Sequence, residues 1–598
     1  MRKAHYLNRN SKSESPSWFV FLDVETKERV IDESKIEAKL WFGYACFYRR
    51  YTKRNKRYDS EEWKRFETHN EFWSWLESLT KAKTKLYIFA HNMSFEFQVM
   101  AAAENMEKLG YKANLIIIDS PPFLIQYRKQ TTTILFTDTM NYFPLALEKL
   151  GKGIGFDKLI MPKGEIDINI WNEYCKRDVE VIKKAMLMFI DFVKENDLGN
   201  FQKTLASQAF AAYRHRFMRK PILIHSDEIA SEVERLSYCG GRTEPFKLGK
   251  FRMPFELLDV NSMYPAVMLN NEFPYQYVCE LRNVDLTKLN ELLSLYCVTA
   301  KCTIKTNENV YPYRNNGKLC FPIGQFITYL STPEIKYAID HKHLQSIEQC
   351  FVYRKSRIFH SFIEELYNLR LKYRLEGNTA YDFMIKILMN CLYGKFGQAG
   401  RKWVNIVQTS DYEFDDWIEV NSDTGESTRF RKALGLVQML ETEPESFNSF
   451  PAIAAHVTAY ARLLLYSYIK QAKAKNVYYC DTDSLLVTKE GFNNLSDVID
   501  ANTLGKLKHE KSLSYVELCG AKDYTFDDVI KIKGIRKTAK VIAENVYQQE
   551  KFWSLKTATR NKLENMQVIE TVTKHLTRQY NKGDVKPNGD IKPFLLSL

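Results

Sequence analysis

Short apolar runs alternate with helix-periodic segments through the first third of the chain. Trp18 to Asp23 and Leu86 to Ala90 are apolar runs of strand length, and Asn169 to Lys194 repeats apolar residues at helical spacing. This alternation is typical of an α/β fold with strands and helices in turn. The pattern therefore predicts an α/β unit over residues 1–198.

The pattern changes after this unit. A strand is predicted at Phe255 to Val260, and the Asn- and Tyr-rich stretch from there to about residue 355 is less regular. Two helices, Ser361 to Glu376 and Tyr381 to Tyr393, are predicted next. The charged segment 399–450 carries Asp-Thr-Gly and Glu-Pro-Glu turns, which suggest loops.

The last third begins with a predicted helix at Ala452 to Ala474, which leads into a strand, a tight turn and a second strand. No internal repeat and no low-complexity linker interrupts the chain. The final 60 or so residues are basic and polar, and we expect them to form a small appendage.

Composition bounds the class of protein. With 598 residues, 45% of them hydrophobic, the chain can build several cores, and we expect three to five subdomains. The formal net charge of +13 would suit a polyanionic partner, although many basic proteins only have solvated charged faces. The 11 cysteines lack zinc-site spacing, the N-terminus is polar and no long apolar stretch is present. We expect a cytoplasmic protein with reduced cysteines and no membrane contact.

The turn Asp481-Thr482-Asp483 joins the two predicted strands near residue 480 and places carboxylates at its tip. Such a tip offers hard oxygen ligands for Mg²⁺, but Asp is also common in ordinary surface hairpins. The segment Tyr-Cys-Asp-Thr-Asp-Ser resembles the signature hairpin of family B DNA polymerases. Two further segments that resemble motifs of this family occur in the order that the family requires.

The first further segment is Asp259-Val-Asn-Ser-Met-Tyr264-Pro, which resembles the family motif Asp-x-x-Ser-Leu-Tyr-Pro with Met in place of Leu. The resemblance implies that Asp259 and Asp483 hold two Mg²⁺ ions, for which Mn²⁺ can substitute, with the Val260 carbonyl as an extra ligand and Asp481 as a secondary one. Tyr264 would lie beneath the sugar and exclude a 2′-hydroxyl. Its alternative role is that of a core tyrosine.

The second segment, Lys386-x-x-x-Asn390-Cys-x-Tyr393-Gly, resembles the fingers helix of the family, with Cys391 at a usual serine. Helical spacing puts the Lys, Asn and Tyr on one face. Lys386 would neutralise the triphosphate, Asn390 would share this nucleotide-facing stripe, and Tyr393 would stack near the nascent base pair. Arg370 on the preceding helix is a second candidate for the triphosphate.

Two shorter segments resemble elements of the family that handle DNA. Tyr238-Cys-Gly240-Gly241 is similar to a Tyr-x-Gly-Gly motif, in which paired glycines let amides approach a phosphate, although a simple glycine turn would look alike. Lys522-Asp-Tyr524 is similar to an element that contacts the primer terminus, and its position carries most of that inference. A downstream basic cluster would follow the duplex backbone: Lys531, Lys533, Arg536 and Lys537.

Upstream, three acid-bearing segments resemble the Asp-Glu-Asp-Asp type of 3′–5′ exonuclease that precedes the palm in family B polymerases. Asp23 and Glu25 alternate on one strand, and Tyr174 and Asp178 lie four apart on one helix. Glu96 stands where the family usually has aspartate, which puts the rate in question. The resemblance implies metal binding by these four acids, positioning of the attacking water by Tyr174, and a grip on the frayed primer end by Asn92 and Phe95. Lys163 resembles a catalytic lysine of the protein-primed subgroup, although a loop lysine is an equal reading.

Long intervals around the fingers motif match the two insertions of protein-primed polymerases of small phages, adenoviruses and linear plasmids. The resemblance implies a ribonuclease-H-like exonuclease domain followed by a right-hand polymerase, with an α/β and α+β multidomain fold. The expected division is as follows: exonuclease domain 1–198, first palm part 199–270, insertion contacting a terminal protein 271–359, fingers 360–398, insertion wrapping DNA 399–450, second palm part 451–535, and thumb 536–598.

The leading hypothesis is a monomeric, proofreading DNA polymerase that starts on a terminal protein and displaces the non-template strand. Its partners would be primer-template and single-stranded DNA, dNTPs and the terminal protein, in a host cytoplasm if the element is viral. One alternative is a family B polymerase that extends ordinary nucleic-acid primers. Another is a polymerase-like chain that has lost synthesis and only binds or trims DNA.

Overall fold

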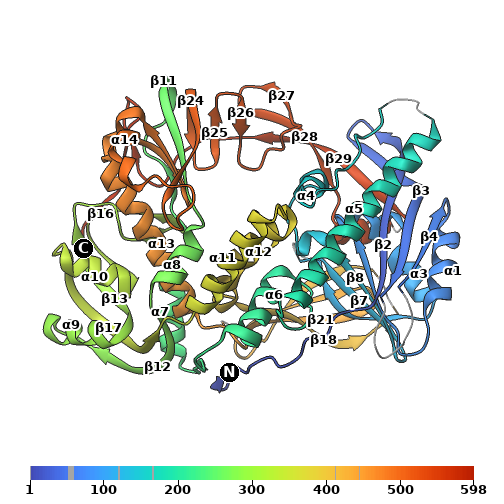
Figure 1. Ribbon diagram of the computed structural model, residues 1–598, viewed down its shortest axis with the longest axis horizontal. Coiled ribbons are helices and arrows are strands. Elements are labelled where there is room, and N and C mark those ends of the chain that lie inside the picture. Colours follow the sequence, from blue (N-terminus) through green and yellow to red (C-terminus); the bar gives the residue numbers. More distant parts are fainter. Residues whose placement is uncertain are drawn as a thin grey trace.

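The structure is a computed structural model that describes residues 2–50, 59–118, 122–163, 167–410, 413–443, 445–563 and 565–598. Figure 1 shows two lobes joined by helices. The N-terminal α/β domain forms one lobe, and the sheet that carries the Asp481-Thr482-Asp483 hairpin lies in the other. The helices α11 (His360–Leu375) and α12 (Thr379–Phe396) lie between them.

The predicted α/β unit is built on a mixed sheet in which β2 runs antiparallel to β3 and parallel to β5, and β5 runs parallel to β8. The long helix α5 (Ile168–Glu195) packs on β2 and β3 and buries one side of its surface. Apolar side chains fill both faces of the sheet, so its strands read as continuous apolar runs. The strands and remaining helices of this unit are β2 (Trp18–Asp32), β3 (Lys35–Arg49), β4 (Ser60–Phe66), α1 (His69–Leu79), β5 (Lys85–Ala90), α2 (Met93–Val99), α3 (Ala102–Lys108), β6 (Lys112–Ile117), β7 (Leu124–Lys129), β8 (Thr132–Asp138) and α4 (Leu147–Gly153).

The predicted palm is a seven-stranded sheet in the order β10-β22-β23-β11-β24-β25-β26. The hairpin strands β22 and β23 lie between β10 and the acid-bearing strand β11. The helix α13 packs beside α7 and α8. The bounds are α6 (Leu205–Ala212), α7 (Glu228–Ser237), β10 (Thr243–Pro245), β11 (Gly249–Val260), α8 (Met263–Asn270), α13 (Pro451–Ala472), β22 (Val477–Asp481), β23 (Ser484–Thr488), α14 (Lys489–Asn494), β24 (Leu507–Gly520), β25 (Asp523–Phe526) and β26 (Val529–Lys531).

The stretch from about 271 to 355 is more regular than its sequence indicates. It forms most of a second seven-stranded sheet, and the expectation of irregular structure was wrong. The central strand β13 is buried on both faces and several ladders contain register shifts, so its sequence shows no clean alternation. The elements are β12 (Phe273–Arg282), α9 (Leu286–Leu295), β13 (Tyr296–Thr306), β14 (Tyr313–Asn315), β15 (Lys318–Cys320), β16 (Ile323–Ser331), α10 (Thr332–Asp340) and β17 (Leu344–Ser356).

The segment 399–450 also differs from its prediction as loops. It folds into a four-stranded antiparallel sheet in the order β18-β21-β20-β19. The strands are largely exposed, which explains their charged sequence, and the buried Arg431 guanidinium lies 4.2 Å from the Trp403 ring centre. The strands are β18 (Gly400–Gln408), β19 (Asp415–Val420), β20 (Ser427–Ala433) and β21 (Leu436–Glu443).

The C-terminal residues are integrated into the fold, which corrects the expectation of a small appendage. β29 pairs with β3 of the N-terminal sheet, so the chain crosses from one lobe to the other (Figure 1). The short β1 (His5–Tyr6) and β32 (Leu595–Leu596) form opposite edges of the second seven-stranded sheet. Unpaired strand edges accept a further strand, and the two chain ends provide it here. The other elements are β9 (Leu223–Ile224), β27 (Lys540–Ala543), β28 (Val546–Phe552), α15 (Leu555–Arg560), β29 (Met566–His575), β30 (Asp584–Val585) and β31 (Ile591–Lys592).

All eleven cysteines are free thiols, as their scattered spacing predicts. Within the described residues, no helix combines the length and apolar character needed to span a membrane.

Candidate active sites

The two acids predicted to hold metal ions in the palm lie on neighbouring strands. Asp259 is the penultimate residue of β11 and is paired in register with Ser484 of β23. The amide of Val260 donates a hydrogen bond to the carbonyl of Asp483 over 2.7 Å. Thr482, at the tip of the turn, has a positive φ of 63°, which lets the two strands reverse within two residues. The fold thus brings together acids that are far apart in sequence.

The electrostatics of this pair fit a cation site. Burial and the nearby Asp483 and Glu510 raise the pKa of Asp259 to about 7, while Lys386 and Lys508 oppose this effect. Burial and then Asp481 raise the pKa of Asp483. Carboxylates that share a half-buried place repel one another when charged, and Mg²⁺ would relieve that repulsion. The oxygen donors suit this hard cation.

Asp481 differs from the other two acids because its carboxylate already has partners. It accepts a hydrogen bond from Thr243 Oγ1 at 2.9 Å, and the ammonium groups of Lys522 and Lys531 lie 3.6 and 3.8 Å away. The two ammonium groups neutralise part of the charge of the Asp481 carboxylate. Asp481, Asp259 and Tyr524 also line one cavity of about 370 Å³ on the sheet.

Two aromatic side chains predicted to hold the nucleotide stack on each other. The rings of Tyr264 on α8 and Tyr393 on α12 are 4.8 Å apart at their centres and inclined by 23°. Lys386 is exposed on α12, and the Asn390 side-chain amide donates to its carbonyl over 2.9 Å. Leu388 and Met389 between them are buried, so Lys386 and Asn390 lie on the more exposed side of the helix, as their spacing predicts.

Arg370, the second candidate for the triphosphate, forms hydrogen bonds within the protein. It is buried on α11, and its Nε donates to Asp382 Oδ1 of α12 over 2.7 Å. A second, longer hydrogen bond of 3.4 Å reaches Ser262 Oγ. Arg370 therefore joins the two fingers helices to the loop that follows Asp259.

The Gly-Gly segment packs directly against the acid hairpin. The amide of Thr482 donates to the carbonyl of Arg242 over 2.7 Å. A Cβ on Gly241 would come within 2.8 Å of Thr482 Cγ2 and 3.2 Å of the Tyr264 hydroxyl, so a side chain here would displace one of them. By contrast, a Cβ on Gly240 would meet open space.

The Lys522-Asp-Tyr524 segment forms the turn into β25. The Lys522 amide donates to the Tyr479 hydroxyl over 3.0 Å, and the Tyr524 ring is stacked on Phe526 at 4.0 Å. Of the downstream basic cluster, Lys531 reaches Asp481, and the Arg536 guanidinium lies 5.2 Å from the Phe552 ring centre. Lys522 and Lys531 thus lie beside Asp481, whereas Arg536 lies against β28.

The four acids of the predicted exonuclease site also influence one another across the N-terminal domain. Burial raises the pKa of Asp23 and that of Glu96 well above the usual range, with Asp178 and Glu25 adding to the effect on Asp23. Burial and then Asp178 raise the pKa of Glu25 to about 7, and burial raises the pKa of Asp178 to about 6. Negative charges that lie close together in a medium of low dielectric constant favour protonation of the carboxylates. A bound cation would stabilise their charged forms instead.

Two carboxylate oxygens of this site have no hydrogen-bond partner within the described residues: Glu96 Oε2 and Asp178 Oδ1. Both side chains are almost fully buried, at 4% and 3% exposure. A buried polar atom without a partner is costly unless a ligand satisfies it. These oxygens therefore fit the predicted Mg²⁺ site.

A lysine that the sequence interpretation missed joins this cluster. Lys158 forms an ion pair with Asp178, and its ammonium lies 4.4 Å from the centre of the Tyr174 ring. Lys163, the residue selected from the sequence, is exposed and forms no hydrogen bond or ion pair with the part of the chain that is described. Both lysines lie in the same segment before α5, so the sequence offered no local signal to choose between them.

The segment from Asn92 to Glu96 is held by a second residue that was missed. Asp138, at the end of β8, accepts hydrogen bonds from the amides of Asn92 and Met93 at 3.0 and 3.1 Å. Asn92 itself is exposed with a positive φ of 75°, and the Phe95 ring meets Phe552 edge-on at 6.2 Å. Phe95 therefore lies where the N-terminal domain meets the strands from the C-terminal end.

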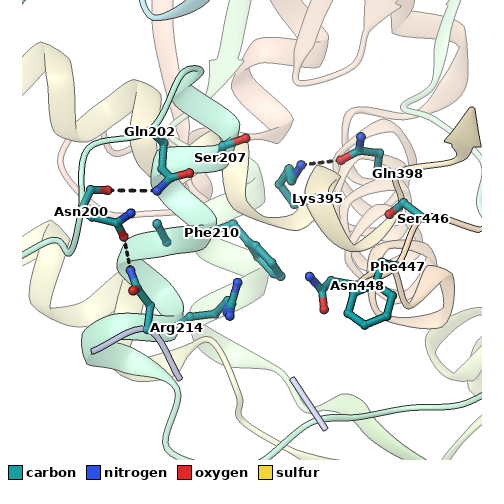
Figure 2. Close-up of a pocket in the computed structure, with 12 residues that line it drawn as sticks. Asn200, Gln202, Ser207, Phe210, Arg214, Lys395, Gln398, Ser446, Phe447 and Asn448 are labelled. Carbon is teal, nitrogen blue, oxygen red and sulfur yellow. Dashed lines mark hydrogen bonds between the residues drawn. The ribbon is translucent and has the colours of Figure 1, made fainter. Parts of the chain in front are cut away.

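A further cavity of about 420 Å³ adjoins the C-terminal end of α12 (Figure 2). Arg214 and Lys395 line it, and burial lowers the pKa of both. Of the described residues that line it, none is acidic. The lining also offers amides, hydroxyls and two rings, from Asn10, Asn200, Gln202, Ser207, Phe210, Gln398, Ser446, Phe447 and Asn448.

These features define a class of fold: a ribonuclease-H-like exonuclease domain followed by a right-hand polymerase. The structure of phi29 DNA polymerase, complexed with primer-template DNA and incoming nucleotide substrates, superposes with a TM-score of 0.67. The alignment covers 94% of this chain and 100% of that one at 17% sequence identity. This likeness confirms the predicted multidomain architecture.

Sequence comparison identifies the family. A family model described as DNA polymerase type B, organellar and viral, matches residues 157–475, more than half of the chain. The chain belongs to this family. It is 26% identical over 371 residues to a probable DNA polymerase of Neurospora intermedia, and 24% identical over 526 residues to the DNA polymerase of Bacillus phage phi29. The matches cover 59% and 79% of this chain, and 37% and 82% of the relatives.

Proposed function

We propose that this protein is a DNA-directed DNA polymerase whose synthetic centre is formed by Asp259 and Asp483. The main observation behind the proposal is that β11 lies directly beside the acid hairpin. The Val260 amide there donates a hydrogen bond to the Asp483 carbonyl. The stacked tyrosines and the exposed Lys386 lie on neighbouring elements. A general cation-binding hairpin would require none of these neighbours.

Each residue of this centre has a proposed role in nucleotidyl transfer. Asp259, Asp483 and the Val260 carbonyl would hold two Mg²⁺ ions, which would supply positive charge to the triphosphate and to the primer 3′-oxygen. Lys386 neutralises negative charge on the triphosphate, and Asn390 lies on the same stripe. Tyr264 closes the space at the sugar C2′, and Tyr393 supports Tyr264 while it faces the new base pair.

Primer extension tests this proposal directly. Wild-type protein with a recessed primer-template, the four dNTPs and Mg²⁺ is expected to extend the primer to the template end. Asp483→Ala should not extend it, and Asp528→Ala, an acid at the start of the β26 segment outside the described site, serves as the control. Equal extension by wild type and Asp483→Ala would rule out the assignment.

We also propose a 3′–5′ exonuclease at Asp23, Glu25, Glu96 and Asp178. Its support is the pair of buried carboxylate oxygens without partners, together with the raised pKa of all four acids. Tyr174 and Lys158 lie beside Asp178, where they can orient a water and neutralise the scissile phosphate. Degradation of a labelled single strand by wild type but not by Asp178→Ala would support it, and equal rates would exclude it.

Initiation on a terminal protein with strand displacement is the finer part of the proposal. It is supported by membership of an organellar and viral family and by two folded insertions at 271–359 and 399–450. The test is incubation with a candidate terminal protein, labelled dATP and Mg²⁺ or Mn²⁺. Label on the protein supports protein priming, whereas extension of DNA primers alone favours a polymerase that uses ordinary primers. We expect a monomer that works in the cytoplasm, where its free thiols stay reduced.

The cavity of Figure 2 suits an unpaired nucleotide of a single strand. Arg214 and Lys395 can meet a phosphate, and the amides can meet base edges. The Phe447 ring is stacked on His5 at 4.0 Å but remains 66% exposed, so a base can extend this stack. Phe447→Ala is expected to weaken binding of a primer-template with a long 5′ template overhang, but not of one with a single-nucleotide overhang. Equal weakening of both would exclude this part of the proposal.

A further inference from the structure

The first insertion, residues 271–359, encloses the Gly-Gly loop from several sides. Two arginines bind three backbone carbonyls of this loop, residues 238–242. Arg314 on β14 donates to the carbonyl of Tyr238 over 2.9 Å. Arg462 on α13 donates to those of Cys239 and Gly240 over 2.6 and 3.0 Å. One of these arginines belongs to the insertion, and the other is held by it.

Glu334 is the residue of the insertion that holds Arg462. Its Oε1 accepts hydrogen bonds from Arg462 Nη2 at 2.7 Å and Nε at 3.3 Å, and the two side chains are 1% and 2% exposed. Its other oxygen accepts from the Ser331 amide and so caps α10. Both oxygens are occupied, which fixes the carboxylate between the helix and the arginine. Because Glu334 binds two nitrogens of the Arg462 guanidinium, it fixes the orientation of that group.

A second arm of the insertion holds the far end of the loop. The buried Arg242 donates from Nη1 to the carbonyl of Asn309 over 2.8 Å, and its guanidinium lies 4.3 Å from the centre of the Phe321 ring. The carbonyl of the same Arg242 accepts the amide of Thr482. The insertion is thus connected to the tip of the acid hairpin through one residue.

The Gly-Gly loop packs against two residues of the proposed synthetic centre. Gly241 is so close to Thr482 and to the Tyr264 hydroxyl that a Cβ would displace one of them. A shift of the loop toward the hairpin would therefore press on Thr482 or Tyr264, and any shift would strain the hydrogen bond between the Arg242 carbonyl and the Thr482 amide. Displacements of about 1 Å at a reacting centre can lower a rate by roughly 100-fold.

We infer that Glu334 is a positioning residue for DNA synthesis, acting through Arg462 on the Gly-Gly loop, and that Arg314 supports the same loop from outside. The inference rests on the proposed polymerase function. It makes the first insertion a structural part of the synthetic centre, in addition to any partner that the insertion binds. Neither side chain needs to touch DNA or nucleotide for this role.

The primary variant is Glu334→Gln, which keeps the size of the side chain and removes its charge. We expect the KM for dNTP to rise and kcat for extension to fall, together lowering kcat/KM about 10- to 100-fold. Because Tyr264 borders the loop, discrimination against ribonucleotides should also fall. Excision of a single-stranded oligonucleotide should stay within about twofold of wild type, because the acids for it lie in another domain.

A buried ion pair can be needed for folding, so a second variant at the surface keeps the test decisive. Arg314→Ala should raise the KM for dNTP and lower ribonucleotide discrimination, and Arg314→Lys should restore part of both. The matched control is Arg282→Ala, an exposed arginine of the same insertion that pairs with Glu280 on its own strand. Its kinetics should equal those of wild type.

The outcomes separate this inference from the proposed function. If wild-type protein does not extend a primer, the polymerase assignment itself fails. If wild type extends the primer, the two variants decide the inference. It is overturned when Arg314→Ala has the same kinetics as Arg282→Ala and Glu334→Gln shows no selective effect. No selective effect means that Glu334→Gln either matches wild type or loses extension, excision and thermal stability together. Selective loss of extension and sugar discrimination in both variants supports it.

Discussion

The two acid clusters of this protein differ in how they balance their charge. In the N-terminal domain, Glu96 and Asp178 are almost completely buried, and one lysine, Lys158, forms an ion pair inside the cluster. In the palm, Asp259 and Asp483 are only half-buried. The cations near the palm acids, including Lys386 and Lys522, lie at the surface.

This difference indicates two ways of preparing a cation site. The N-terminal cluster is the more enclosed of the two, because Glu96 on α2 and Asp178 on α5 are almost completely buried, while Asp23 and Glu25 on β2 are half-buried. The palm acids are half-buried and the lysines near them are exposed, which suits a site that a nucleic acid and a triphosphate have to reach. A buried acid cluster selects a ligand by its size and shape. An exposed acid cluster binds cations more strongly when the incoming molecules change the local charge.

The largest expected effect is the separation of the two activities. Asp483→Asn should lower primer extension by about 1000-fold or more while excision of a single strand continues, because a ligand to the proposed metal ions is lost from one site only. Asp23→Asn should have the reverse effect. Extension assays with an exonuclease-resistant primer and excision assays without dNTPs measure the two rates. A variant that loses both activities while remaining folded would contradict the assignment of two independent sites.

The next effect distinguishes two lysines of the N-terminal domain. Lys158→Ala should slow excision by about 100-fold, because the ammonium that faces Asp178 and Tyr174 is removed. Lys163→Ala is the matched control and should excise at nearly the wild-type rate, since its side chain is exposed. Single-turnover excision of a labelled oligonucleotide checks both. If Lys163→Ala slowed excision more than Lys158→Ala, Lys163 and not Lys158 would be the lysine that acts in excision.

A smaller effect compares the two cations of the fingers. Lys386→Ala should raise the KM for dNTP about tenfold and leave thermal stability unchanged, because the side chain is exposed. Arg370→Ala should instead destabilise the protein by about 1–3 kcal/mol, since it breaks a mostly buried ion pair with Asp382. Steady-state kinetics and denaturant unfolding separate the two. If Arg370→Ala changed only KM, its assignment as a bridge between helices would be wrong.

The smallest effect concerns stability and pH in the absence of divalent metal. The pKa of Glu25 is raised to about 7 and that of Asp178 to about 6, so these groups bind protons more tightly in the folded state. Their stabilisation is complete below the unfolded pKa of about 4 and is lost as the pH rises through 6 to 7. With EDTA, we expect Tm to be about 2–5 °C lower at pH 8 than at pH 5.5.

Two controls assign that pH effect to the N-terminal cluster. Mg²⁺ should reduce the difference in Tm, because it binds the charged carboxylates of the folded state. The double substitution Glu25→Gln with Asp178→Asn should flatten the profile more than Asp259→Asn does. Identical profiles for wild type and the double variant would show that other groups cause the pH dependence.

Much of the fold and of both sites could be predicted from local sequence. The strand that carries Asp23, the helix that carries Asp178 and the hairpin at Asp481 have periods and turn residues that act over a few positions. The two insertions were predicted less well. Their strands are either buried on both faces or exposed on most of their length, so neither shows the alternation that identifies a half-buried strand.

The sequence by itself determined which residue types bear the chemistry, because carboxylates at strand ends and a polar helix stripe are local patterns. Only the tertiary structure decided which neighbours those residues have. It placed Lys158 rather than Lys163 against Asp178, paired Arg370 with Asp382, and placed Glu334 against Arg462 beside the Gly-Gly loop. Ion pairs and close packing depend on distances between segments remote in the chain, and those distances exist only once the sheets have assembled.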